Sequence, residues 1–186
     1  MAQDHFNSRD HEGLQRLLAI LQAHHDKKRA NDLIPLVQGY LAELRNEPKV
    51  AIEAYQRIAE KSAHKINALK RLFEIYIKSQ DYDQALSALK SLADKELVYV
   101  PMYADLLQAT GNSNNAVEVY TDYLLANPND LNTMLKLGKI YLQEGVADGV
   151  AWTMSYILDK DPENKEALEL LSEMGLSMES TEISEN

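Results

Sequence analysis

Residues 116–130 read AVEVYTDYLLANPND, and residues 150–164 read VAWTMSYILDKDPEN. Each stretch starts with a small or β-branched residue, has apolar side chains four and seven positions later, and closes with a proline among polar residues. The second stretch begins 34 residues after the first. Apolar residues at this spacing share one face of a helix, and proline disfavours helical conformation in the residue before it. The two stretches therefore predict equivalent helices of an internal repeat.

The same register extends over most of the chain. Ala51, Ala85, Ala116 and Val150 occupy corresponding positions, with successive offsets of 34, 31 and 34 residues. A small side chain lets two helices cross closely, whereas a bulky one would hold them apart. Few Gly or Pro residues interrupt these segments, and apolar residues keep helical spacing throughout. We therefore predict an all-α fold of antiparallel helix pairs, without strands.

The pattern also predicts where the repeats begin and end. We expect a flexible N-terminal segment over 1–13, a helical repeat domain over 14–175 and a disordered acidic tail over 176–186. Within the domain, repeats are expected at about 32–65, 66–96, 97–130 and 131–164, with a capping helix at 163–175. The expected helices are 14–29, 32–45, 48–61, 66–78, 82–94, 97–110, 114–126, 131–144, 147–159 and 163–174.

The repeat resembles that of the tetratricopeptide repeat (TPR) family, whose unit is a helix-turn-helix of 34 residues. The resemblance is carried by QDYDQALSALKSL at 80–92, LNTMLKLGKIYLQEG at 131–145 and the closures NPND and DPEN. It implies a right-handed superhelical array, an α-solenoid, whose first helices line a concave groove that binds other proteins. The chain departs from the family pattern early in its first helices, where a large aromatic residue is replaced by Pro35, Leu69, Val100 and Met134.

The resemblance directs attention to first-helix residues outside the packing positions. Among the charged first-helix residues of this set, five are basic and two, Glu74 and Asp105, are acidic, although the whole chain has a net charge of −10. A groove of this kind could hold an acidic peptide with a few apolar anchors; the alternative is an ordinary solvated surface. The predicted peptide-binding residues are Leu36, Tyr40, Asn67, Lys70, Arg71, Lys78, Met102, Asp105, Lys136 and Lys139.

One subclass of the family grips a partner's C-terminal carboxylate. It uses a Lys and an Asn one helical turn apart and a second Asn in the next repeat. Here Lys70 is followed one turn later by Glu74, and Met102 stands where the second Asn is expected. The sequence therefore does not predict this carboxylate clamp.

Other function classes find little support. The acidic chain disfavours binding to nucleic acid, and no motif of an enzyme, a cofactor site or a metal site is present. Adjacent His24 and His25 would point about 100° apart on a helix, which does not suit joint metal ligation. No apolar stretch is long enough to cross a membrane, and the start MAQDHFNSRDHEG does not resemble a secretory signal. We expect a cytoplasmic protein that is not an enzyme and needs no cofactor.

Two hypotheses for function remain. The first is a scaffold or adaptor that binds a peptide segment of a partner protein in its groove. The second is a structural protein that self-assembles into homo-oligomers by repeat stacking or exchange, with the groove filled by a neighbour or by the N-terminal segment. Trp152 lies two residues after Val150, where the register predicts an outward position. It is a possible association surface, and packing against the final helix is the alternative.

Overall fold

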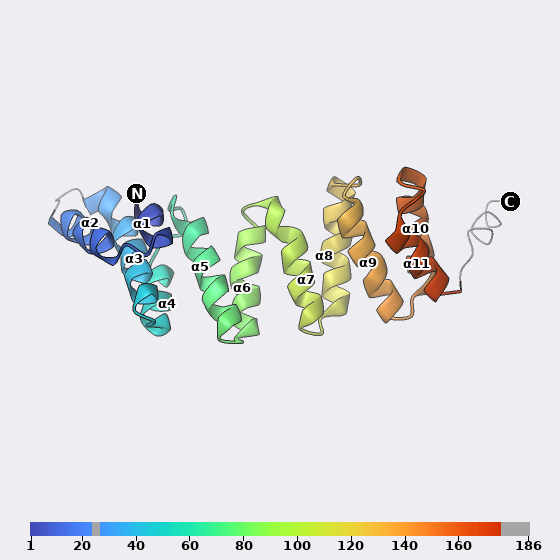
Figure 1. Ribbon diagram of the computed structural model, residues 1–186, viewed down its shortest axis with the longest axis horizontal. Helices are drawn as coiled ribbons and strands as arrows, with labels where there is room; N and C mark the ends of the chain where they lie inside the picture. The colour runs from blue at the N-terminus through green and yellow to red at the C-terminus, as the bar shows by residue number, and fades with distance from the viewer. Residues whose placement is uncertain (24–26, 176–186) are drawn as a thin grey trace. The chain divides into compact units, whose positions relative to one another are not determined.

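The computed structural model of the protein describes residues 1–23 and 27–175, and Figure 1 shows it as a ribbon. The acidic tail predicted at 176–186 lies outside these residues. The described part is helical and contains no strand. Its elements are α1 (Ala2–Asn7), α2 (His11–Ala23), α3 (Lys27–Leu44), α4 (Pro48–Gln56), α5 (Lys65–Lys78), α6 (Tyr82–Ala93), the 3-10 helix η1 (Leu97–Tyr99), α7 (Val100–Ala109), α8 (Ser113–Ala126), α9 (Leu131–Gln143), α10 (Ala147–Lys160) and α11 (Lys165–Glu173).

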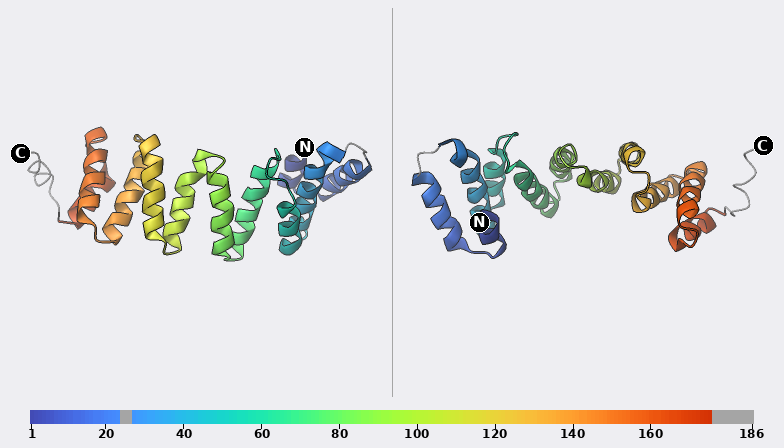
Figure 2. Two further views of the ribbon diagram at one scale, coloured as in Figure 1. Left: turned by 180° about the vertical axis from the view of Figure 1, so that it is seen from behind. Right: turned by 90° about the horizontal axis from the view of Figure 1, so that it is seen from above.

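The chain forms two compact units, Met1–Leu97 and Val98–Asn186. In unit 1, α3 pairs with α4 and α5 with α6, while α2 packs on α3, and α1 contacts both α2 and α3. In unit 2, α7 pairs with α8 and α9 with α10, and α11 packs against α9 and α10. Figure 2 shows the helices of each pair running side by side in opposite directions. The predicted all-α fold of antiparallel helix pairs is confirmed.

The small residues of the repeat lie where the paired helices cross. Ala51, Ala85, Ala116 and Val150 are fully buried. A similar close approach occurs at Gly39, where an added Cβ would lie 2.3 Å from the ring of Tyr55. Such a distance is far below van der Waals contact, so a larger residue at position 39 would force the Tyr55 ring to move. Side-chain size at these positions therefore sets how closely each pair packs.

Helix ends use the local chemistry that the sequence suggests. The side chain of Asp130 accepts a hydrogen bond from the backbone N–H of Thr133 at 3.1 Å and so caps the start of α9. Asn46, Gly111 and Gly145 adopt positive φ in the turns between paired helices. These turn residues reverse the chain within each pair.

Several boundaries differ from the prediction. The helix expected at 14–29 corresponds to α2, which ends at Ala23, and the helix expected at 32–45 corresponds to α3, which begins at Lys27. The segment 1–13, predicted to be flexible, contains α1 and the start of α2, because Asp10 caps α2 through Gly13 N–H at 2.8 Å and α1 packs on α2 and α3. The second helix of the first repeat was expected to reach residue 61, but α4 ends at Gln56. Ile58 is still buried in the turn that follows. Ile58 lies at a position that would be buried in a continued helix, and for this reason the sequence pattern predicted a longer helix than the structure contains.

Candidate functional site

The predicted apolar end of the groove is covered in unit 1. Leu36 and Tyr40 lie on α3 and are both buried. The ring of Phe6, from α1, stacks on the ring of Tyr40 with 4.4 Å between centroids and 19° between planes. The Tyr40 hydroxyl donates a hydrogen bond to Oε1 of Gln3, also on α1. The sequence predicted Leu36 and Tyr40 as peptide-binding residues; in the structure both are buried, and α1 lies over Tyr40.

Arg71, predicted as a groove cation, is the centre of an ionic cluster. Its Nε donates to Oε1 of Glu43 at 2.9 Å, and a second guanidinium nitrogen donates to the other Glu43 oxygen. The third nitrogen donates to Glu74. The Tyr55 hydroxyl also donates to Glu43, at 2.5 Å. The charge of Arg71 is therefore balanced by two carboxylates rather than open to a ligand.

Burial shapes the ionisation of this cluster. It raises the pKa of Tyr40 to about 12. It raises the pKa of Tyr55 further, and the Glu43 carboxylate adds to that increase. Burial works against the charge of Arg71, but the hydrogen bonds and charge of Glu43 keep its pKa above the usual value. At neutral pH the cluster therefore consists of protonated phenols around a charged guanidinium.

The other predicted residues of unit 1 lie along α5. Asn67 and Lys70 are half-buried, and Lys78 is exposed. Lys78 lines an open cleft of about 230 Å³, together with Glu43 and Glu47. The cleft has mixed charge, so its lysine lies among carboxylates.

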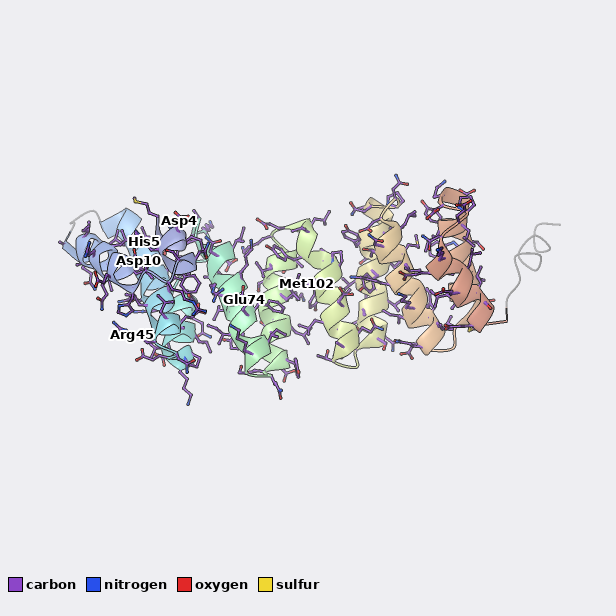
Figure 3. All side chains as sticks on the ribbon, viewed as in Figure 1. Asp4, His5, Asp10, Arg45, Glu74 and Met102 are labelled. Atoms are coloured by element: carbon purple, nitrogen blue, oxygen red, sulfur yellow. The ribbon has the colours of Figure 1, made fainter. Side chains whose placement is uncertain are left out.

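In unit 2 the predicted residues divide between α7 and α9. Met102 is 45% exposed on α7, and Figure 3 labels its side chain. Asp105, one turn further along α7, accepts from Lys136 Nζ of α9 at 2.6 Å. It also accepts from the hydroxyl of Tyr120. The structure thus brings two of the predicted residues, Asp105 and Lys136, into direct contact.

Two further polar contacts join neighbouring helices of unit 2. Gln108 Nε2 on α7 donates to Oε1 of Gln143 on α9 at 2.7 Å. Lys139 Nζ on α9 donates to Oε2 of Glu166 on α11 at 2.8 Å. Corresponding faces of successive helices are therefore linked by side chains about one repeat apart in sequence.

Trp152 forms part of an apolar cleft in unit 2. Trp152 is 56% exposed, and the centroid of its ring lies 6.5 Å from the centroid of the Tyr156 ring. The predicted outward position of Trp152 is confirmed. The cleft has a volume of about 200 Å³ and is lined by residues of α8, α9 and α10 and of the turn after α8. No residue of α11 is among them. The lining residues are Thr121, Leu124, Leu125, Pro128, Met134, Leu137, Trp152 and Tyr156.

Sequence reasoning missed the partners of the predicted cations. Glu43 precedes Arg71 by 28 residues, and Glu166 follows Lys139 by 27. A search for opposite charges at nearly one repeat length could have found both pairs. Phe6 gave a weaker signal, as one aromatic residue within a polar stretch.

The described residues contain no candidate metal centre. Residues 1–23 and 27–175 contain no group of three or more His, Asp or Glu side chains that could hold a metal ion. Every fully buried side-chain polar atom in this part of the chain has a hydrogen-bond partner. No described helix is long and apolar enough to cross a membrane.

Solved structures with the same fold are repeat proteins. A tetratricopeptide repeat protein from Parabacteroides merdae ATCC 43184 has a TM-score of 0.61 and 17% identity; the match covers 77% of this chain and 60% of that one. MamA has a TM-score of 0.56 and 16% identity, covering 94% of this chain and 96% of its own. YrrB, described as a TPR protein with an unusual peptide-binding site, has a TM-score of 0.52 and 15% identity, covering 80% and 87%.

Comparison of the sequence with family models also identifies a tetratricopeptide repeat. A search of curated proteins gave no significant match. The family model for the tetratricopeptide repeat matches residues 44–110, which run from the end of α3 to the end of α7. This match, the buried small residues of the repeat and the structural likeness agree with one another. Residues 44–110 therefore match the tetratricopeptide repeat family, and the described chain shares its fold with solved repeat proteins.

Proposed function

We propose that this protein is a non-catalytic scaffold that binds a peptide segment of a partner protein on the exposed side of its first helices. The observation that carries the proposal is the set of polar contacts between α7 and α9 in unit 2. Asp105 meets Lys136, and Gln108 meets Gln143, at hydrogen-bond distance. These contacts hold side chains of two successive repeats in fixed orientations before any ligand arrives.

Preformed orientation favours binding because less side-chain freedom is lost when the partner docks. Met102 supplies an exposed apolar side chain on α7, one turn from Asp105. An apolar contact surrounded by ordered polar groups is a common arrangement in protein interfaces. We infer that the partner segment crosses α7 and α9, with an apolar side chain on Met102.

Charge contributes less than the sequence suggested. Arg71, Lys136 and Lys139 already contact carboxylates of this chain. The pairs of Lys136 and Lys139 are exposed, and such an ion pair is worth only about 0–1 kcal/mol, so exchanging its carboxylate for one of the partner changes the free energy of binding little. An acidic partner segment is still compatible with the proposal if its carboxylates replace residues such as Glu166 at Lys139. The partner must then gain most of its affinity from apolar contacts and shape.

Charge reversal at matched positions tests the proposal. Lys139 on α9 and Lys160 on α10 each contact one carboxylate and have similar side-chain exposure. A partner recovered by affinity capture should bind Lys139→Glu about two- to fivefold more weakly than wild type at low salt, which corresponds to the worth of one exposed ion pair. It should bind Lys160→Glu like wild type, because Lys160 lies on a second helix. Equal affinity for both variants and wild type would overturn the proposed surface.

Self-assembly is a second candidate, favoured by the apolar cleft at Trp152. Leu125, on the same cleft, is 79% exposed. Exposed apolar side chains grouped in this way are typical of association sites. Light scattering should show a concentration-dependent increase in mass for wild type that Trp152→Glu abolishes. Leu168→Glu, at an exposed apolar residue of α11 outside this cleft, is the matched control. A monomer at all concentrations for wild type would exclude this candidate.

A further inference from the structure

Helix α1 is bound to the protein much as a separate peptide would be. It has six residues, and none of them is buried. A helix of this length is unstable on its own in water, so its conformation depends on what it touches. Phe6 and Gln3 contact the repeats: Phe6 stacks on Tyr40 and lies under the guanidinium of Arg71, and Gln3 accepts from Tyr40.

We propose that Tyr40 and Arg71 form an aromatic-binding slot for a helical peptide of the partner, and that α1 occupies this slot in the free protein as an internal ligand. The inference rests on the proposed function, since it assumes that the first helices of unit 1 also bind a partner segment. It adds a defined ligand chemistry and a competitor within the same chain.

The walls of the slot are held by contacts that do not involve α1. The ring of Tyr40 packs edge-on against that of Tyr55, with centroids 6.1 Å apart and planes at 67°. The guanidinium of Arg71 is fixed by Glu43 on α3 and Glu74 on α5. Its carbon lies 4.6 Å from the centroid of the Phe6 ring, within the range of a cation–π contact. Because these supports come from α3, α4 and α5, the slot should keep its shape after α1 leaves.

The contacts of α1 define what an incoming peptide must offer. An aromatic side chain fills the place of Phe6, between a phenol ring and a guanidinium. A carboxamide or carboxylate oxygen three residues earlier takes the place of Gln3 and accepts from the Tyr40 hydroxyl. Residues three apart lie on the same face of a helix, so both contacts can be made at once. The slot therefore selects a short helix with an acceptor at position i and an aromatic residue at i+3.

The turn after α1 acts as a clasp that keeps it in place. His5 Nδ1 lies 2.7 Å from Oδ2 of Asp10, and Gly13 N–H donates to the other Asp10 oxygen at 2.8 Å. Figure 3 shows His5 and Asp10 beside each other where α1 meets α2. None of these residues belongs to the slot. Loosening the clasp should therefore make the slot more accessible without altering its walls.

A labelled peptide of residues 1–10, MAQDHFNSRD, tests the slot in trans against the full chain. Fluorescence anisotropy compares wild type with Phe6→Ala, which removes the ring that fills the slot. The tethered α1 competes at a high effective concentration in wild type, so Phe6→Ala should bind the peptide at least tenfold more tightly. A peptide with alanine in place of its phenylalanine should bind the variant at least tenfold more weakly than the original.

A second variant makes the result independent of Phe6. Asp10→Ala breaks the clasp, keeps every slot residue, and should bind the peptide several-fold more tightly than wild type. Circular dichroism confirms that both variants remain helical. The inference is overturned if the two peptides bind Phe6→Ala equally, or if neither binds at concentrations near 1 mM, where binding free energy is only about −4 kcal/mol.

Other results separate the possible occupants of the slot. If light scattering shows a wild-type dimer that Phe6→Ala abolishes and Trp152→Glu does not, α1 is exchanged between two copies and the internal-ligand assignment is wrong. If the peptide fails to bind but Lys139→Glu still weakens capture of a partner, the slot is wrong and the proposed function stands. If the peptide binds as expected but Lys139→Glu has no effect, the slot stands and the proposed surface of unit 2 does not.

Discussion

Phe6 of α1 and Tyr40 of α3 stack with their ring centroids 4.4 Å apart and their planes inclined by 19°. The contact explains why Tyr40 has no exposed surface, although it lies on a first helix whose outward residues were predicted to bind a ligand. Offset stacking of two rings contributes about 0.5–1.5 kcal/mol beyond the burial of their surface. A six-residue helix is therefore held mainly by the chemistry of one ring and its surroundings.

Tyr40→Phe should lower the free energy of unfolding by about 0.5–1.5 kcal/mol. The change removes the hydrogen bond to Gln3 but retains the ring that stacks on Phe6. Tyr40→Ala should cost roughly 3–5 kcal/mol, because it also leaves a cavity under α1. Urea denaturation of the three proteins measures both differences. A cost for Tyr40→Phe as large as that for Tyr40→Ala would contradict this division between hydroxyl and ring.

Ala116→Leu should destabilise the protein by about 1–3 kcal/mol. Ala116 is fully buried in the pair of α7 and α8, and a larger side chain there would overpack the crossing. The control is Ala126→Leu, an exposed position in the last turn of the same helix, which should be nearly neutral. Thermal melting compares the variants, and equal melting temperatures would mean that the predicted register does not set the packing.

Substitution of Arg71 should lower the free energy of unfolding, because it leaves the buried carboxylate of Glu43 without its main ion-pair partner. Their side chains are only 17% and 11% exposed. Arg71→Met should lower stability by roughly 3 kcal/mol, at the lower end of the cost of breaking a buried ion pair. Glu43→Gln added to Arg71→Met should recover part of this loss, since no uncompensated carboxylate remains. Additive costs in a double-mutant cycle would show that the two residues do not interact energetically.

Asp130 should make stability depend on pH in the acid range. Burial alone would raise the pKa of its carboxyl, but hydrogen bonds from Thr133 N–H and hydroxyl and from Tyr123 hold the pKa below its usual value. A lowered pKa in the folded state gives stability that is present above the unfolded pKa and is lost as pH falls through the folded pKa.

The matched variant for this prediction is Asp130→Asn, because asparagine can still cap α9 but does not titrate. Denaturation at neutral pH and at about pH 3 should show a smaller loss of stability for Asp130→Asn than for wild type. Parallel losses in the two proteins would assign the acid sensitivity to other groups.

The repeat register is the part of the fold that the sequence determined by itself. Ala51, Ala85, Ala116 and Val150 mark crossings between helices that are neighbours along the chain. Such packing depends on side-chain size and helical periodicity, and both can be read within one repeat length. The left-handed turns at Asn46, Gly111 and Gly145 follow from equally local preferences. The helical periodicity also predicted that Trp152, two residues after Val150, lies on the outward side of its helix.

The tertiary structure alone decided which predicted site residues are available. The sequence gives the charges of Lys136 and Lys139 but not the distances to Asp105 and Glu166, and the strength of an ion pair depends on those distances. Helix α1 is a stronger case, because a helix of six residues, four of them polar, is too short to be stable by itself. It forms because Phe6 meets Tyr40 and Arg71, residues of α3 and α5 that only the folded chain brings together.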